Sequence, residues 1–325
     1  MDQIKHLQEE IHKLINSQQY HRSPVELYEP VRYIMSLGSK RLRPMLTLLA
    51  NNMFDGDINK ALYPALAIEI FHNFTLLHDD IMDNAPLRRG SQTVHKKWNA
   101  NIAILSGDTM FAMAYQYAIR TDNRFIPSIL EVFSQTAIEV CEGQQLDMNF
   151  ETSQSVSIQE YLEMIRLKTA VLLGACLKIG AITAEASTEN TELLYEFGTL
   201  MGIAFQLKDD LLDLYGNEDM FGKLTGGDVL ANKKTYLVLR AIDMANHEDR
   251  SRLLELYHPE QPIKGEEKIR EVKTLFDKYN IQQEVDSIMR QYLVNAFEKL
   301  NQTTVADEKK DLLRNYAKNI YDRMS

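Results

Sequence analysis

The sequence predicts an all-α protein. Its 325 residues include only 14 Gly and 8 Pro, and no proline occurs between Pro127 and Pro259. Apolar residues recur at intervals of three and four along most of the chain, which is the period of an amphipathic helix, and no alternating run competes with it. We find no linker, repeat or shift in composition, and therefore expect one helical domain that spans residues 1–325.

The expected helices follow this periodicity from the N-terminus onward. The segment 2–19 mixes charged and amide residues with isolated Ile and Leu, and 58–83 contains the apolar stretch LAIEIFHNFTLLH. The most apolar stretch, 169–184, is interrupted by Lys178 and is too short to span a bilayer. The expected helices are 2–19, 25–37, 41–53, 58–83, 101–119, 124–150, 158–185, 190–215, 233–246, 249–256, 266–278, 280–300 and 305–323.

Two polar segments with Gly or Pro interrupt the helical pattern, at 84–92 (NAPLRRGSQ) and 216–232 (GNEDMFGKLTGGDVLAN). Each directly follows a cluster of aspartates. The second segment is not a P-loop, because no strand precedes it and Lys223 is followed by Leu224 rather than by Ser or Thr.

Composition excludes several classes of function. The 46 acidic and 36 basic residues give a net charge of -10, which argues against nucleic acid as a partner. Cys141 and Cys176 lie in apolar helical patterns without a CxxC or a His/Cys cluster, so neither a disulfide framework nor a zinc site is predicted. The first twenty residues lack the apolar stretch of a signal peptide. We expect a cytoplasmic protein without a transmembrane segment.

Two aspartate clusters with the same spacing, HDDIMD (78–83) and KDDLLD (208–213), are the strongest signal in the sequence. Residues four apart share a helix face, so Asp79 and Asp83 project together, as do Asp209 and Asp213. These like charges repel one another near helix C-termini, and a cation should compensate. Clustered carboxylates without His or Cys suit Mg²⁺, which shares its coordination with phosphates and water. The alternative, two solvated acidic turns, is disfavoured by the apolar helices before both clusters and the basic loops after them.

Basic residues gather near the same segments, in GSKRLRP (38–44), in LRRG (87–90), at Lys223 and at 233–234. Arg offers a planar fork to phosphate oxygens and Lys a mobile point charge, so a substrate with two anionic groups could be held between these residues and metal ions. His72 lies one or two turns beneath the first aspartates, where a structural core histidine and an anion ligand are equally compatible with the pattern.

Together these motifs resemble the trans-isoprenyl diphosphate synthases, the family of farnesyl, geranylgeranyl and longer polyprenyl diphosphate synthases. The resemblance spans nearly the whole chain. It implies an isoprenoid-synthase-type helical bundle around a deep central cavity, and a homodimer. The matching segments are GSKRLRP (38–44), HDDIMD with LRRG (78–83 and 87–90), GQQLD (143–147), Lys168-Thr169, FQLKDDLLD (205–213) and GDVLANKKT (227–235).

The resemblance also implies the reaction and the roles of its residues. Isopentenyl diphosphate would be joined to an allylic diphosphate, with release of diphosphate, at a site that holds three Mg²⁺ ions. The metal ligands would be Asp79, Asp80, Asp83, Asp209, Asp210 and Asp213. The allylic diphosphate would be bound by Arg88, Lys168, Lys223 and Lys233, and isopentenyl diphosphate by Lys40, Arg43, His72 and Arg89. Thr169 and Gln206 would place dipoles near the developing allylic cation.

Four residues depart from the family pattern: Ser39, Ala170, Asn232 and Leu237. None of the departures removes a charged ligand. Asn232 stands where Gly normally precedes the lysine, and because Asn tolerates left-handed backbone, we expect that turn to survive. Leu237 stands where the family often has Pro.

The length of the product is expected to depend on the helix before the first aspartates. Phe74 lies five residues before Asp79, about 7.5 Å down the helix axis. An aromatic residue here, and the lack of an insertion between the aspartates, resemble short-chain enzymes, so we favour a farnesyl or geranylgeranyl product with Phe74 as the floor of the cavity and Phe71 assisting. The alternative is that Phe74 belongs to the ordinary core.

Other functions remain open at this point. They are a longer-chain polyprenyl diphosphate synthase and a class I terpene cyclase, although cyclases typically pair one DDxxD with an Asn/Ser/Glu motif. A di-iron bundle is suggested by Glu9-x-x-His12 and Glu69-x-x-His72. A regulatory subunit of a heteromeric synthase is a non-enzymatic alternative, but such subunits usually lack one or both aspartate motifs.

Overall fold

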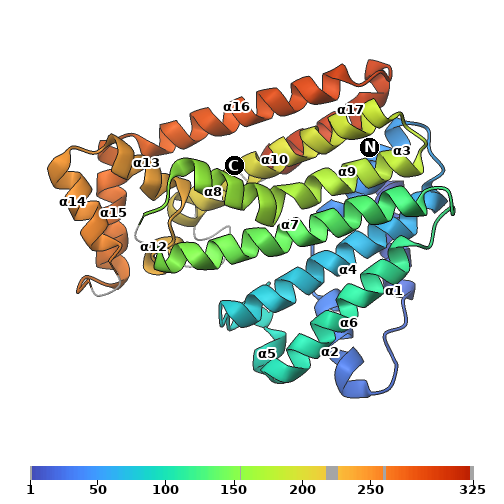
Figure 1. Cartoon of the computed structure of the whole chain (residues 1–325), viewed down its shortest axis with the longest axis horizontal. Helices are drawn as coiled ribbons and strands as arrows, with labels where there is room; N and C mark the ends of the chain where they lie inside the picture. The colour runs from blue at the N-terminus through green and yellow to red at the C-terminus, as the bar shows by residue number, and fades with distance from the viewer. Residues whose placement is uncertain (1, 154, 217–225, 259–260, 323–325) are drawn as a thin grey trace. The chain divides into compact units, whose positions relative to one another are not determined.

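The structure, a computed structural model, describes residues 2–153, 155–216, 226–258 and 261–322 (Figure 1). Nearly all of the described secondary structure is helical, which confirms the predicted fold class. The chain divides into two compact units. The first comprises Met1–Ser134, Ala175–Leu194 and Thr304–Leu313, and the second comprises Gln135–Gly174, Tyr195–Thr303 and Arg314–Ser325. The expected single domain stays a prediction.

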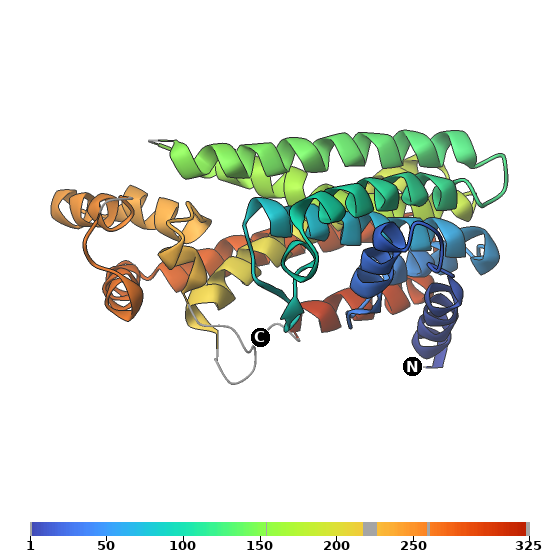
Figure 2. The same cartoon turned by 90° about the horizontal axis from the view of Figure 1, so that it is seen from below.

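The first unit is built around one long helix, α4, which packs against α3 and α6. Figures 1 and 2 show α4 and α6 side by side. Ala61, Leu66 and Ile68 on α4 are fully buried, and the small alanine side chains let the neighbouring backbones approach closely. The elements are α1 (Asp2–Ser17), α2 (Val25–Ser36), α3 (Leu42–Met53), α4 (Ile58–Met82), β1 (Leu87–Arg88), β2 (Ser91–Gln92), α5 (Val94–Lys97) and α6 (Ala100–Ala118).

The second unit has a continuous apolar core that includes Tyr161, Leu207, Leu211, Phe276 and Val285. Four helices contribute residues to both units: α7 (Ile126–Thr152), α9 (Val171–Thr183), α10 (Thr188–Tyr215) and α17 (Asp307–Asp322). The remaining elements of the second unit are α8 (Ile158–Ile165), the π-helix η1 (Arg166–Ala170), α12 (Gly227–Leu230), α13 (Tyr236–Met244), α14 (His247–Leu256), α15 (Gly265–Lys278) and α16 (Ile281–Gln302).

The expected long helices are confirmed, with ends that shift by a few residues, and three features were not expected. The segment predicted as one helix over 158–185 is divided by η1, and the short helices α5 and α12 and the β1–β2 hairpin occupy segments left as loops. None of the helices in the described part of the chain is both long and apolar enough to cross a bilayer.

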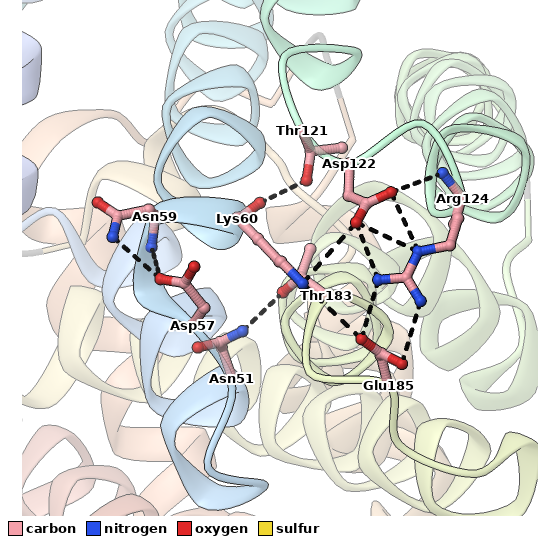
Figure 3. A network of polar contacts seen from close by, with 9 residues as sticks. All are labelled: Asn51, Asp57, Asn59, Lys60, Thr121, Asp122, Arg124, Thr183 and Glu185. Atoms are coloured by element: carbon pink, nitrogen blue, oxygen red, sulfur yellow. Dashed lines mark hydrogen bonds and ion pairs between the residues drawn. The ribbon is translucent and has the colours of Figure 1, made fainter.

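A network of polar contacts joins three connections within the first unit (Figure 3). Pro64 has no N–H, so the carbonyl of Lys60 lacks its usual helical partner, and the hydroxyl of Thr121 donates to it instead at 2.7 Å. Nearby, the guanidinium of Arg124 pairs with Asp122 and with Glu185, at 2.9 and 3.1 Å. The network thus ties the start of α4 to the α6–α7 and α9–α10 connections.

Candidate active site

A polar cavity of about 310 Å³ lies within the second unit. Its lining joins four segments of the chain: the end of α7, α8 with the π-helix η1, the last turns of α10 and residues 228–235. The polar and charged side chains in the lining include Asp147, Lys168, Thr169, Gln206, Asp209, Asp210, Asp213, Asp228, Lys233 and Lys234. The structure therefore brings together the predicted residues of the second aspartate motif, the Lys168-Thr169 pair and Lys233.

The π-helix η1 presents Lys168 and Thr169 to this cavity. Two glycines allow neighbouring helices to touch it. A Cβ on Gly143 of α7 would lie 2.2 Å from the backbone nitrogen of Lys168, and one on Gly202 of α10 would lie 2.5 Å from the Cα of Ala170. Single turns of π-helix are frequent at functional sites, and this one places two consecutive polar side chains in the cavity wall.

A chain of hydrogen bonds runs along the cavity wall. The Thr169 hydroxyl donates to Gln206 Oε1 at 3.1 Å, and Gln206 Nε2 donates to Asp210 Oδ1 at 3.0 Å. The Tyr161 hydroxyl donates to the other oxygen of Asp210. Beside this chain, Lys168 Nζ lies 2.5 Å from Asp147 Oδ2. These contacts fix the side chains of Thr169 and Gln206, for which the resemblance implied dipoles near the developing allylic cation.

The three aspartates of the second motif have different surroundings. Asp210 is buried, and burial, with Asp228 nearby, raises the pKa of its carboxyl to about 8 although Tyr161 and Gln206 donate to it. Asp209 is exposed. Asp213 is half-buried and accepts a hydrogen bond from the backbone N–H of Asp228 at 2.9 Å. The pair one turn apart thus borders the cavity as predicted, whereas the middle aspartate is engaged by protein groups.

Two consecutive lysines, Lys233 and Lys234, follow the turn that ends α12. Lys233 is exposed and lies 3.5 Å from Asp228 Oδ1. Lys234 donates to the carbonyl of Phe150 at 2.5 Å, close to the C-terminal end of α7, where a cation is favourable. Burial lowers the pKa of Lys234. Lys223, the remaining lysine predicted to bind diphosphate, lies outside the described residues.

The first aspartate motif closes α4 in the first unit. Asp83 is the exposed C-cap, and Asp79 is half-buried one turn before it. Asp80 is buried, and its Oδ1 accepts from two nitrogens of Arg88, at 2.6 and 3.0 Å. Burial raises the pKa of Asp80, and Arg88 offsets part of the rise. The expected convergence of the two aspartate motifs on one cavity stays a prediction.

The β1–β2 hairpin carries both arginines that follow this motif. Leu87 pairs with Gln92 and Arg88 with Ser91, and the two loop residues, Arg89 and Gly90, have φ of 53° and 75°. Positive φ at both positions matches the twist of a tight hairpin, but it is unfavourable for a residue with a Cβ. Such backbone strain at Arg89 is typical of functional positions.

A cluster of guanidinium groups surrounds His72, also in the first unit. Arg43 lies 3.0 Å from His72 Nε2, and because a guanidinium only donates, the imidazole nitrogen accepts. Burial, and then the charges of Arg43, Arg89, Arg88 and Arg41, lower the pKa of His72 well below its usual value. His72 is therefore neutral and lies in a positive environment. Lys40 is exposed and has no hydrogen bond or ion pair to any residue that the structure describes.

Phe74 and Phe71 belong to an aromatic cluster in the first unit. The Phe74 ring lies 5.7 Å from Phe71, 5.2 Å from Phe111 and 4.7 Å from the His78 ring, between centroids. Phe71 is fully buried and also meets Phe133, at 5.3 Å, whereas Phe74 is only half-buried. The position of Phe74 above Phe71 is compatible with the predicted floor, whose role stays a prediction.

The di-iron alternative does not fit the contacts of Glu69. Oε1 of this buried carboxylate pairs with Arg41 at 2.5 Å and also accepts from Asn73, so this oxygen is engaged within the core. Across the described part of the chain, no group of three His, Cys, Asp or Glu side chains is arranged to hold a metal ion by itself. Arg41 instead has a structural role, because it also donates to the carbonyl of Met35 and thereby ties the start of α3 to the end of α2.

Comparison with known proteins decides the family. A family model described as polyprenyl synthetase matches residues 24–276. The chain belongs to the polyprenyl synthetase family. It is 42% identical over 245 residues to the geranylgeranyl diphosphate synthase of Methanosarcina mazei, covering 75% of this chain and 76% of that protein. It is 35% identical over 292 residues to the short chain isoprenyl diphosphate synthase of Methanothermobacter thermautotrophicus, covering 89% and 88%.

Solved structures of the polyprenyl synthetase family agree with this assignment. A crystal structure of a geranylgeranyl pyrophosphate synthase has a TM-score of 0.91 and 42% identity over 97% of both chains, and one from Pyrococcus horikoshii has a TM-score of 0.88 and 34% identity, also over 97% of both. The predicted isoprenoid-synthase fold and the predicted class of prenyltransferase are thereby confirmed.

Asp147, Tyr161 and Asp228 are among the cavity residues that had been given no role from the sequence. Asp147 and Asp228 are polar residues within the motifs GQQLD and GDVLANKKT, and the shared motif was a signal that could have identified them. Tyr161 has no such signal. It precedes η1 by about one turn, and its contact with Asp210 depends on the packing of α8 against α10.

Proposed function

We propose that this member of the family condenses isopentenyl diphosphate with an allylic diphosphate, and that the cavity of the second unit binds the allylic diphosphate. The observation that carries the proposal is the lining of that cavity. It combines Lys168 and Lys233 with the aspartates of the second motif, and it sets Thr169 and Gln206 beside them. The names of the relatives described above support the same reaction.

The proposed chemistry requires stabilisation of charge and no side-chain nucleophile. The carbon–oxygen bond of the allylic diphosphate breaks, and its electron pair leaves with the diphosphate oxygen. Lys168 and Lys233 stabilise this developing negative charge, and the oxygen dipoles of Thr169 and Gln206 lie near the allylic carbon as it becomes positive. The double bond of isopentenyl diphosphate then attacks the cation. Loss of one proton, to the released diphosphate, completes the new double bond.

The oxygen donors of the cavity fit Mg²⁺. Asp209 and Asp213 offer hard carboxylate ligands one turn apart without a competing His or Cys, and Asp79 and Asp83 offer the same in the first unit. Asp80 and Asp210 would have to exchange their present partners to join them. When bound, Mg²⁺ would supply Lewis-acid stabilisation of the diphosphate oxygens. A cation that completes its coordination with substrate oxygens and water needs no site built from protein ligands alone.

We propose that the guanidinium cluster of the first unit binds isopentenyl diphosphate. Arg43, Arg89 and neutral His72 gather positive charge and hydrogen-bonding groups in one place. The Nε of Arg43 is buried and has no hydrogen-bond partner among the described residues, so a donor remains for an anion. Substrate diphosphate would satisfy this donor.

We further propose geranylgeranyl diphosphate as the product, with Phe74 as the floor of the chain-elongation cavity. The partly buried aromatic ring one to two turns below Asp79 supports a short product, and so do the names of the relatives. The homodimer and the cytoplasmic location stay predictions.

Steady-state kinetics of two lysine variants tests the assignment of the cavity. Lys168→Met keeps the length of the side chain but removes the charge at the cavity, and it should lower kcat/KM for the allylic substrate by about 100-fold or more. Lys178→Met is the matched control on the following helix, where the lysine pairs with Glu192. Equal activity of the two variants would contradict the assignment.

A further inference from the structure

Lys268 on α15 is a buried charged side chain to which the reaction proposed above gives no role. It is only 2% exposed. Its Nζ donates to the carbonyl of Val229 at 2.6 Å and to Oδ1 of Asn232, and it lies 5.1 Å from the centroid of the Tyr257 ring. Among the residues that the structure describes, no carboxylate forms an ion pair with it. Burial of an ammonium group is costly unless hydrogen bonds compensate, so these two acceptors must hold firm positions.

The two acceptors belong to the turn that ends α12. Val229 is buried and lies in the last turn of the helix, and Asn232 follows with a φ of 56°. The start of α12 also rests on α15, because a Cβ on Gly226 would come within 2.8 Å of the side chain of Ile269. Consecutive residues of α15, 268 and 269, therefore hold the two ends of this short helix.

The same turn carries two groups of the cavity. The N–H of Asp228 donates to Asp213 Oδ2 at 2.9 Å, and the N–H of Lys233 donates to the carbonyl of Asp228 at 3.0 Å. The side chain of Lys233 then lies 3.5 Å from Asp228 Oδ1. A change in the backbone between 228 and 233 would thus displace both the carboxylate of Asp213 and the ammonium of Lys233.

We propose that Lys268 is a positioning residue for the allylic diphosphate site. Through Val229 and Asn232 it holds the turn 228–233 in the conformation that directs Lys233 to the cavity. The inference rests on the proposed function, in which that cavity binds the allylic diphosphate. A glycine at position 232, as in the family pattern, would adopt the same left-handed backbone but would offer no acceptor, so Asn232 and Lys268 act as a pair in this chain.

The test is steady-state kinetics of the purified full-length enzyme, with KM measured separately for the allylic diphosphate and for isopentenyl diphosphate. Lys268→Met and Asn232→Gly should each raise KM for the allylic substrate about tenfold and leave KM for isopentenyl diphosphate unchanged. Because Lys268→Met already removes the contact that Asn232→Gly removes, the double variant should be no worse than Lys268→Met. Lys264→Met, an exposed lysine at the start of the same helix, should behave as the wild type.

Several results would overturn the inference. Unchanged allylic KM in both single variants, equal changes in both KM values, or additive effects in the double variant would each do so. If Lys268→Met does not fold, Asn232→Gly decides alone, because it keeps the lysine and the backbone conformation. If the wild type turns over and the variants have an unchanged KM for the allylic diphosphate, only the positioning role is refuted. No turnover by the wild type with any allylic primer refutes the proposed function, and the positioning role with it.

Discussion

Replacement of Phe74 by alanine should lengthen the product by one isoprene unit. The growing chain is expected to extend along α4 away from Asp79, and Phe74 lies about 7.5 Å below that residue along the helix axis, with Phe71 about 4.5 Å further. One isoprene unit adds four bonds to the main chain, or about 5 Å of extended length. Removal of the Phe74 ring therefore makes room for one unit before the chain meets the rings of Phe71 and Phe111, which lie 5.7 and 5.2 Å from Phe74.

The cost to stability should be moderate. Phe74 is half-buried, so Phe74→Ala should cost less than the roughly 3–5 kcal/mol of a fully buried phenylalanine. Phe71→Ala, at a fully buried position, should reach that range. Phe54→Ala is the matched control, because Phe54 is also a half-buried phenylalanine but ends α3 instead of lining α4.

The assay is separation of products by chain length after incubation with labelled isopentenyl diphosphate and farnesyl diphosphate. The wild type and Phe54→Ala should give geranylgeranyl diphosphate, and Phe74→Ala should give geranylfarnesyl diphosphate. An unchanged product from a folded, active Phe74→Ala enzyme would show that Phe74 belongs to the ordinary core and that the floor lies elsewhere.

Three further predictions concern His72, Glu69 and Gly143. Below pH 6.5, the usual pKa of histidine, His72 binds a proton in the unfolded chain but not in the folded chain. The stability that this residue contributes is therefore present above pH 6.5 and is lost as the pH falls. Denaturant unfolding from pH 7 to 5 should show a loss of up to about 1.4 kcal/mol per pH unit that is missing in His72→Gln. Glu69→Gln should destabilise the protein by about 3–5 kcal/mol in the same assay, because it leaves Arg41 buried without its charge partner; a change below 1 kcal/mol would contradict the buried pair. Gly143→Ala should lower kcat by about tenfold or more, because the new Cβ would meet the backbone of Lys168 at 2.2 Å; normal kcat would show that η1 tolerates displacement.

The helices could be predicted from the sequence because apolar periodicity dominates where a helix packs into a core. The expected 190–215 and 266–278, for example, are observed as Thr188–Tyr215 and Gly265–Lys278. The π-helix could not be predicted, because Arg166–Ala170 contains ordinary helix-forming residues, and the glycines of α7 and α10 that pack against it are distant in the sequence. The hairpin after Asp83 depends in turn on positive φ at Arg89, a residue without particular preference for it.

The chemistry of the second unit was largely visible in its motifs, and what was missed depends on tertiary contacts. Spacing alone places Asp209 and Asp213 together, but it cannot show that Asp210 turns towards Tyr161. In the same way, the sequence pattern of the amphipathic helix 266–278 predicts that Lys268 is a solvent-exposed charge. Only packing against α12 reveals that Lys268 is buried.

The central claim is that this protein elongates an allylic diphosphate with isopentenyl diphosphate in a reaction that requires Mg²⁺. The most direct measurement is incubation of the purified protein with isopentenyl diphosphate, Mg²⁺ and, separately, dimethylallyl, geranyl or farnesyl diphosphate, with a matched EDTA control, followed by resolution of the products by length. Elongation that ends at geranylgeranyl diphosphate, is abolished by EDTA and is restored by excess Mg²⁺ is the predicted result. No elongation with any of the three primers, or elongation that is unaffected by EDTA, would contradict the account.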